Sequence, residues 1–167
     1  MAEIKFSIIT VNLNNCEGLK KTVDSVLQQS YPHIQYIVID GKSNDASVDL
    51  IKSQQDLINY WISEVDENAY HAMNKGIEVA TGDYLIFLNS GDYFYEPQSL
   101  EKITKYVSTQ SAEIYYTDVL IGYRENTTLK KYPAKLNINF FFKTSLCHQT
   151  TIFSKTVFAK YGQYNKQ

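Results

Sequence analysis

Three short polar segments carry the side chains most able to do chemistry. They are residues 12–15, 40–45 and 89–92, rich in Asn, Asp and Ser, and each directly follows an apolar run. A carboxylate there can hold the base or ribose of a nucleotide, while a metal ion covers the diphosphate. Asp40 and Asp92 are placed for those two tasks. Water-facing loops are also polar, so any one segment alone is weak evidence.

The elements around these segments predict how they are positioned. Apolar runs at 5–11, 35–39, 59–62 and 84–88 are typical of buried strands, and helical spacing is found at 16–29, from 46, at 67–80 and after Pro97. Alternating strands and helices predict a doubly wound α/β domain with a mostly parallel sheet and helices on both faces. Ligands then bind beyond the carboxyl ends of the strands, where all three polar segments fall.

The C-terminal third differs in pattern. Residues 113–123 and 129–132 predict an antiparallel hairpin around 125–128, and residues 139–142 predict a short helical turn. A further strand is expected at 147–153. We therefore expect a small antiparallel addition within one domain that spans residues 1–167.

Composition excludes several classes of protein. The 167 residues carry 16 basic and 18 acidic side chains, which disfavours a general nucleic-acid binder. The two cysteines form no Cys-x-x-Cys pair, and neither a signal peptide nor a membrane-spanning run is visible. A reduced cytoplasmic protein is expected. The glycine-rich signatures of dinucleotide oxidoreductases and phosphate-loop ATPases are missing.

Six ordered blocks resemble the family 2 glycosyltransferases, which have the glycosyltransferase-A fold. They read SIITVN (7–12), VIDGKSND (38–45), SEVDENAY (63–70), AMNKGI (72–77), ATGD (80–83) and FLNSGD (87–92). The resemblance resumes at 116–119, 147–149 and 161–164. It is strongest to the enzymes of bacterial capsular, exopolysaccharide and colanic-acid biosynthesis.

The resemblance implies a nucleotide-sugar donor, with a UDP-sugar expected, and names its contacts. The backbone around Asn12 would line the base, Asp40 would bind uracil or ribose, Asp66 would contact the base, and Lys75 would approach the diphosphate or sugar. The full set of implied donor contacts is Thr10, Val11, Asn12, Asp40, Gly41, Ser43, Asp45, Asp66, Asn74, Lys75, Asn89, Ser90 and Gly91.

The last block stands where the family has its Asp-x-Asp metal motif. Here Asn89 and Gly91 replace two carboxylates, so Asp92 is the only acid in the segment. A divalent cation, Mn²⁺ or Mg²⁺, would then need the phosphates of the donor to complete its shell.

The resemblance also implies an inverting transfer to a saccharide or lipid-linked acceptor in cell-surface polysaccharide synthesis. Family members continue for about eighty residues beyond the last block, so the general-base Asp, much of the acceptor site and any membrane-associating helices are expected there. His148 and Asp118 are secondary candidates for catalysis; a structural role is the alternative for each. The expected location is the cytoplasm, including a peripheral position at the inner face of the membrane. A sugar nucleotidyltransferase and a non-catalytic nucleotide-sugar-binding protein stay open as alternatives.

Overall fold

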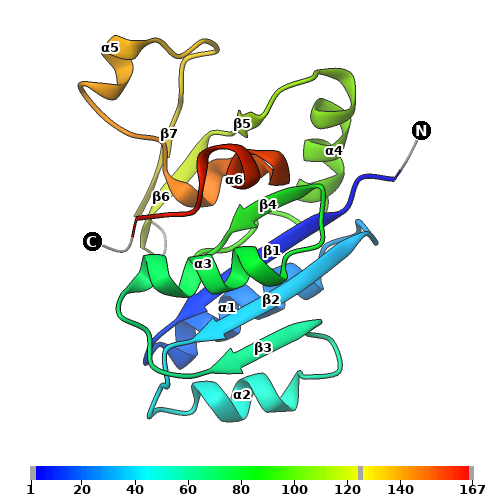
Figure 1. Ribbon diagram of the computed structural model, residues 1–167, viewed down its shortest axis with the longest axis vertical. Helices are drawn as coiled ribbons and strands as arrows, with labels where there is room; N and C mark the ends of the chain where they lie inside the picture. Colours follow the sequence, from blue (N-terminus) through cyan, green and yellow to red (C-terminus); the bar gives the residue numbers. More distant parts are fainter. Residues whose placement is uncertain (1–2, 124–125, 166–167) are drawn as a thin grey trace.

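A six-stranded sheet forms the centre of the computed structural model, which describes residues 3–123 and 126–165 (Figure 1). Its strand order is β3-β2-β1-β4-β8-β5. The strands are β1 (Phe6–Asn12), β2 (Ile34–Asp40), β3 (Tyr60–Ser63), β4 (Tyr84–Phe87), β5 (Ile114–Tyr116) and β8 (Thr151–Ser154). A separate two-stranded sheet consists of β6 (Val119–Tyr123) and β7 (Asn126–Lys130).

The register of the central strands confirms the predicted fold class. β1 pairs in parallel with β2 on one side and with β4 on the other, and β2 pairs in parallel with β3. β8 is antiparallel to both β4 and β5. All seven residues of β1 are buried, because helices cover both faces of a parallel sheet.

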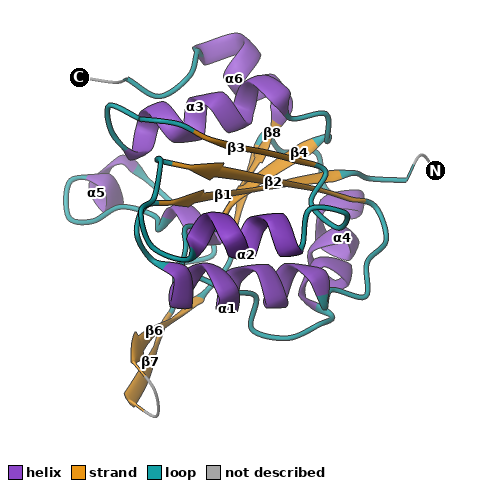
Figure 2. Ribbon diagram, turned by 90° about the horizontal axis from the view of Figure 1, so that it is seen from below, coloured by secondary structure: helices purple, strands orange, loops and turns teal. Residues whose placement is uncertain are grey.

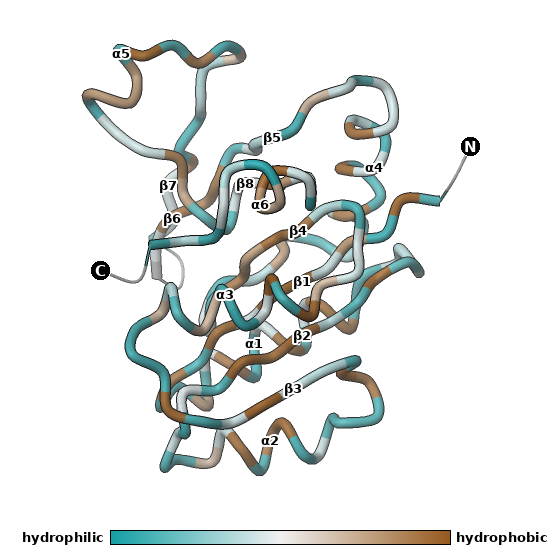
Figure 3. Tube along the Cα trace, viewed as in Figure 1, coloured by the Kyte–Doolittle hydropathy of each residue, from teal (hydrophilic) through white to brown (hydrophobic). Residues whose placement is uncertain are grey.

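The helices form one layer on each side of the sheet (Figure 2). α1 (Cys16–Leu27), α2 (Ser47–Ser53) and α4 (Ser99–Thr109) cover one face, and α3 (Ala69–Val79) and α6 (Lys155–Tyr161) cover the other. Each layer has its own apolar cluster, with Leu19 and Val23 of α1 on the first face and Met73 and Ile77 of α3 on the second. Figure 3 shows that hydrophobic residues, drawn in brown, are frequent along the central strands between these layers.

Asparagine side chains begin the two helices that flank the polar edge of the sheet. The Asn15 Oδ1 accepts the Gly18 N–H at 3.1 Å at the start of α1, and the Asn68 Oδ1 accepts the His71 N–H at 3.0 Å at the start of α3. Such caps satisfy backbone donors that the first helical turn leaves open. The predicted helix at 67–80 therefore begins two residues later, after its cap.

Three expectations for the C-terminal third are wrong. Residues 113–123 do not form one strand: β5 joins the main sheet and β6 pairs only with β7. Residues 126–128 are not a turn, because Asn126 already pairs with Tyr123 across the hairpin; Glu125 lies outside the described residues. His148–Thr150 form a 3₁₀ turn, so the strand expected at 147–153 begins only at Thr151.

The predicted helical turn at 139–142 is present as α5 (Ile138–Phe141). Among the described residues, no helix is both long and apolar enough to cross a membrane.

Candidate functional site

The carboxyl ends of β1, β2 and β4 bring the three polar segments together. Asn12 and Asp40 are register partners at the ends of β1 and β2, and the Gly41 N–H donates to the Asn12 carbonyl at 2.8 Å. After β4, the Ser90 N–H donates to the Val11 carbonyl at 3.0 Å. One edge of the sheet therefore carries residues of all three segments, as the sequence predicts.

Asp40 is fully buried and its carboxylate accepts four hydrogen bonds. Its Oδ1 accepts from the Asn12 Nδ2 at 2.8 Å and the Ser43 Oγ at 2.6 Å. Its Oδ2 accepts from the Ser43 N–H at 2.9 Å and the Ser63 Oγ at 2.6 Å. A carboxylate offers about four acceptor positions, and these donors use all of them. Burial alone would raise the pKa of Asp40, but the hydrogen bonds from Ser43, Ser63 and Asn12 outweigh it and lower the pKa.

Asn12 keeps an acceptor that nothing in the described protein satisfies. Its Nδ2 donates to Asp40 and, at 3.2 Å, to the Ser43 Oγ, whereas its buried Oδ1 has no hydrogen-bond partner. The opposite orientation of the amide would point this oxygen at the Asp40 carboxylate, which also carries only acceptors. A buried polar atom without a partner is costly, and a ligand donor would remove that cost.

Hydrogen bonds link neighbouring residues of the first two segments. The Ser43 Oγ accepts the Asn14 N–H at 2.8 Å, and Asp45 accepts the N–H groups of Cys16 and Ser47, each at 2.9 Å. Thr10 is different, because its buried hydroxyl shares a 3.2 Å hydrogen bond with the Tyr36 hydroxyl inside the sheet.

Helix α1 fixes the third segment. The Thr22 Oγ1 donates to the Asp92 carbonyl at 2.7 Å and accepts the Gly91 N–H at 3.0 Å. The Asn15 Nδ2 donates to the Ser90 carbonyl at 2.9 Å. Gly91 has φ 107°, a conformation that favours glycine and that turns the chain before Asp92.

The Asp92 side chain has one weak partner, the Gln149 Nε2 at 3.4 Å from its Oδ1. Burial raises the pKa of this carboxyl, which shows that its environment disfavours the uncompensated charge. Nearby in the same segment, the buried Asn89 Oδ1 has no hydrogen-bond partner among residues 3–123 and 126–165. No group of three His, Cys, Asp or Glu side chains that could hold a metal occurs in the described parts of the chain. One carboxylate and one free amide oxygen fit a cation that takes further ligands from a substrate.

Lys75 lies between two acids at the end of β3. Its Nζ is 2.6 Å from the Glu64 Oε1 and 2.7 Å from the Asp66 Oδ1. Burial acts to lower the pKa of Lys75, but the hydrogen bonds and charges of Asp66 and Glu64 outweigh it and raise the pKa. The lysine is charged and already neutralised, so reaching a diphosphate requires it to leave at least one acid.

Asn74 is buried and bound to the C-terminal segment. Its Nδ2 donates to the Tyr164 carbonyl at 2.9 Å, and its Oδ1 accepts the Tyr164 N–H at 3.0 Å. This pairing holds the Tyr164 ring against His148, where the two rings stack 5.6 Å apart with an interplanar angle of 14°. The contact of Asn74 with a donor stays a prediction.

A cavity of about 520 Å³ opens beside Asn89. Its lining residues are Ala69, Tyr70, Met73, Asn89, Lys130, Ser145, Leu146, Cys147, His148 and Gln149. Burial lowers the pKa of His148, so its imidazole is neutral at pH 7 and can accept a hydrogen bond on one ring nitrogen. Sequence reasoning missed Tyr70 and Gln149 as site residues, although both lie inside the blocks quoted above.

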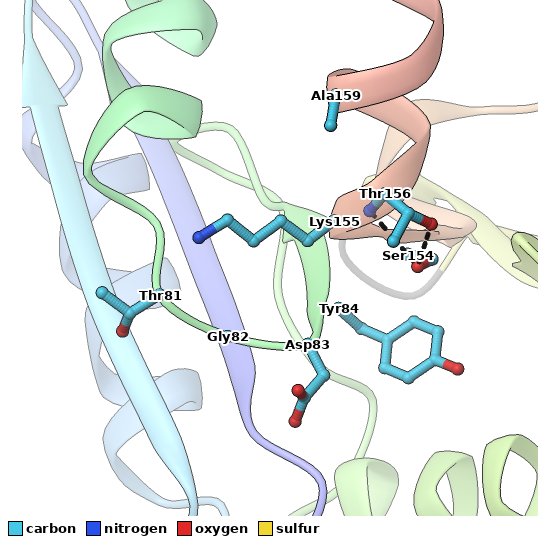
Figure 4. Close-up of a pocket in the computed structure, with 8 residues that line it drawn as sticks. All are labelled: Thr81, Gly82, Asp83, Tyr84, Ser154, Lys155, Thr156 and Ala159. Carbon is cyan, nitrogen blue, oxygen red and sulfur yellow. Dashed lines mark hydrogen bonds between the residues drawn. The ribbon is translucent and has the colours of Figure 1, made fainter.

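Asp118 lies apart from this cavity lining. Its Oδ1 accepts the Tyr132 N–H at 2.9 Å, at the base of the segment that carries α5. A second depression, of about 460 Å³, lies at the opposite edge of the sheet (Figure 4). It is lined by Thr81, Gly82, Asp83, Tyr84, Ser154, Lys155, Thr156 and Ala159, and it contains none of the predicted site residues.

The model of the family described as glycosyl transferase family 2 matches residues 7–161. The chain belongs to this family. A glycosyltransferase of PGL/p-HBAD biosynthesis from Mycobacterium bovis is 27% identical over 99% of this chain and 65% of its own length. The chain covers 51 to 65% of the length of the curated relatives that it matches.

Two solved structures share the fold of this family member. TarS 1-349 from S. aureus in complex with UDP has a TM-score of 0.78 and 17% identity, over 98% of this chain and 51% of that one. The mannosyltransferase PcManGT from Pyrobaculum calidifontis, in complex with GDP-Man and Mn²⁺, has a TM-score of 0.76 and 12% identity, over 99% and 49%. The glycosyltransferase-A expectation for the fold is thereby confirmed.

Proposed function

We propose that this chain is the donor-binding part of an inverting glycosyltransferase that moves a sugar from a UDP-sugar to a saccharide or lipid-linked acceptor. Cell-surface polysaccharide synthesis on the cytoplasmic side of the membrane is the proposed setting. The observation that carries the proposal is the convergence of Asn12, Asp40 and Asp92 at one edge of the sheet. The bound UDP and GDP-Man named for the two structural neighbours support a nucleoside-diphosphate donor.

Asp40 and Asn12 have different tasks in this proposal. Asp40 binds no ligand directly, because Asn12, Ser43 and Ser63 use its acceptor positions. It orients Asn12 so that the free Oδ1 meets an N–H of the base. Uracil carries such an N–H at its N3 position, whereas cytosine does not.

The third segment is suited to a divalent cation. Asp92 would supply a carboxylate and Asn89 a neutral oxygen, and phosphates of the donor would provide further ligands. When bound, the cation stabilises the negative charge that grows on the departing diphosphate. Lys75 adds positive charge at the same edge only if it exchanges Glu64 or Asp66 for a phosphate.

The cavity beside Asn89 is proposed to receive the acceptor. His148 is neutral there and is held by its stack on Tyr164, so it can accept a hydrogen bond from an acceptor hydroxyl. The general-base Asp is still proposed to lie beyond residue 167, in the part of the family that this chain does not cover.

One experiment separates this proposal from its alternatives. The full-length protein is incubated with UDP-sugars, candidate acceptors and Mn²⁺ or Mg²⁺, and released UDP is measured. Acceptor-dependent UDP release supports the transferase. Release of pyrophosphate from UTP and a sugar 1-phosphate would instead identify a sugar nucleotidyltransferase, and UDP binding without either reaction would identify a non-catalytic binding protein.

A further inference from the structure

The segment between β7 and β8 has an unusual charge. We call residues 130–146 the basic arm; it contains Lys130, Lys131, Lys135 and Lys143 and no acidic residue. Residues 126–167 together hold seven lysines and no Asp or Glu, whereas residues 1–125 hold nine basic and eighteen acidic side chains. The small net charge of the whole chain is therefore the sum of a strongly positive region, residues 126–167, and a negative region, residues 1–125.

The basic arm also exposes large apolar side chains. Ile138 is 67% exposed, Phe141 53% and Phe142 80%, all in or next to α5. Figures 1 and 3 show α5 and the hydrophobic stretch around it standing away from the central sheet. Exposed apolar residues gathered on one projecting segment mark an interaction surface, whereas single exposed ones are ordinary.

The base of the basic arm is anchored, so the exposure at α5 is not a loose end. The Tyr132 N–H donates to Asp118, and the Tyr132 hydroxyl accepts the Cys147 N–H at 3.1 Å. Phe140 packs edge-on against the Tyr132 ring at 6.1 Å and Phe141 packs edge-on against Phe140 at 5.2 Å, yet Phe141 and Phe142 stay exposed.

We propose that the basic arm docks on an anionic lipid surface. Aromatic and aliphatic side chains enter the boundary between headgroups and acyl chains, and nearby lysines are attracted to the anionic headgroups. The combination favours lipid over a nucleic acid, because bases could stack on Phe141 and Phe142 but not on the exposed aliphatic Ile138. It also favours lipid over a neutral protein surface, which would leave four lysines without opposite charge.

The position of the arm gives this docking a purpose that rests on the proposed function. Lys130, Ser145 and Leu146, at the two ends of the basic arm, line the cavity beside Asn89. An arm seated on a membrane would hold that cavity close to the headgroups, where a lipid-linked acceptor presents its saccharide.

Flotation of the full-length protein with lipid vesicles tests the docking without any donor or acceptor. Binding is expected to phosphatidylcholine vesicles that contain phosphatidylglycerol, to weaken with salt, and to be absent with phosphatidylcholine alone. Lys131→Glu/Lys135→Glu should weaken binding by at least about fivefold per lysine. Phe141→Ser/Phe142→Ser should weaken it by at least about fivefold in total.

The matched controls change the same residue types elsewhere on the surface. Lys21→Glu/Lys52→Glu on α1 and α2, and Leu57→Ser/Tyr106→Ser, should bind vesicles as the wild type does. UDP affinity should be unchanged in all four variants, which shows that they fold and separates this test from that of the proposed function.

Three results would overturn the proposal. They are no binding of the wild type to anionic vesicles, equal binding by the arm variants and the wild type, and binding to single-stranded polynucleotide without binding to vesicles. A wild type whose arm residues instead hold two copies together, with the arm variants becoming monomeric and no lipid bound, would identify a self-association surface.

Discussion

Two adjacent side chains at the polar edge, Asp40 and Asn12, differ in what they leave free for a ligand. Asp40 has every acceptor position occupied by the protein, whereas Asn12 retains one buried acceptor. Substituting Asp40 should therefore mainly disturb the structure of the site and lower the stability of the fold. Substituting Asn12 should mainly remove a contact with the ligand and lower its affinity.

Asp40→Ala should lower the free energy of unfolding by about 1 to 3 kcal/mol, because it leaves the hydroxyls of Ser43 and Ser63 and the Asn12 amide without their acceptor. UDP binding should weaken with it. Urea denaturation and calorimetry measure the two effects, with the exposed Asp56→Ala as control. Unchanged stability and unchanged UDP affinity would together remove Asp40 from the site.

The effect of Asp40→Ala on the free energy of unfolding should depend on pH. The folded protein lowers the pKa of Asp40, so the stabilisation by its carboxylate is complete above the unfolded pKa of about 3.9 and is lost as the pH falls through the folded value. The stability difference between the wild type and Asp40→Ala should therefore shrink as the pH is lowered below about 4. A difference that grows towards acid would contradict the hydrogen-bonded carboxylate.

Asp92→Asn should uncouple metal binding from UDP binding. With one carboxylate in the segment, we expect negligible Mn²⁺ binding to the free protein and strong mutual enhancement once UDP is present. Calorimetric titration of UDP with and without Mn²⁺, in the wild type and in Asp92→Asn, measures the coupling. Because burial raises the pKa of Asp92, coupling should be lost at a higher pH than for an ordinary Asp. Equal UDP affinity in all four titrations would rule out a metal-dependent donor site.

Close packing between α3 and β1 is the contact that positions the second half of the site. Gly76 faces Ile9, and a Cβ at this position would lie 2.5 Å from the Ile9 Cγ2. The absence of a side chain lets the helix carrying Asn74 and Lys75 lie against the strand that ends at Asn12. The separation of α3 and β1 thus depends on one residue.

Gly76→Ala should destabilise the fold by about 1 to 3 kcal/mol, although alanine is the better helix former by about 1 kcal/mol. The reason is the clash with Ile9 at the centre of the sheet. Glu78→Ala, at an exposed position of the same helix, provides the control and should change stability little. Thermal and urea unfolding compare the two; a Gly76→Ala protein as stable as the wild type would show that α3 can shift freely.

The first two-thirds of the fold could be predicted from the sequence because its elements are local. Strands such as β1 and β2 are mostly apolar, since helices cover both faces, and the helices between them have regular apolar spacing. The pairing of β5 and β8 could not be predicted, because β5 has only three residues and β8 only four, too short for a distinct pattern, and a 3₁₀ turn occupies the start of the strand expected at 147–153. Likewise, nothing near Asp40 in the sequence indicates that Ser63, on another strand, uses one of its acceptor positions.

Across the whole molecule, protection from hydrogen exchange should decrease from the sheet centre to the basic arm. β1 and β4 are buried and flanked by paired strands on both sides, whereas β6 and β7 pair only with each other and expose Leu120 and Leu129. Mass-spectrometric exchange of the full-length protein should show β1 exchanging slowest and residues 119–146 much faster. Equal protection of β6–β7 and β1 would mean that the two-stranded sheet is covered by another surface.

The pairing of β4 with β8 also bears on how the protein folds as it is made. β8 lies between β4 and β5 in the sheet, and Ile86 pairs with Ile152, which the ribosome adds 66 residues later. At a synthesis rate of about 5 to 20 residues per second, β8 is made about 3 to 13 s after β4, and until then that edge of β4 is unpaired. During this time Leu85 and Ile86 form an open apolar strand edge, which can pair with other chains. Newly made copies should therefore depend on chaperones more than the finished fold suggests.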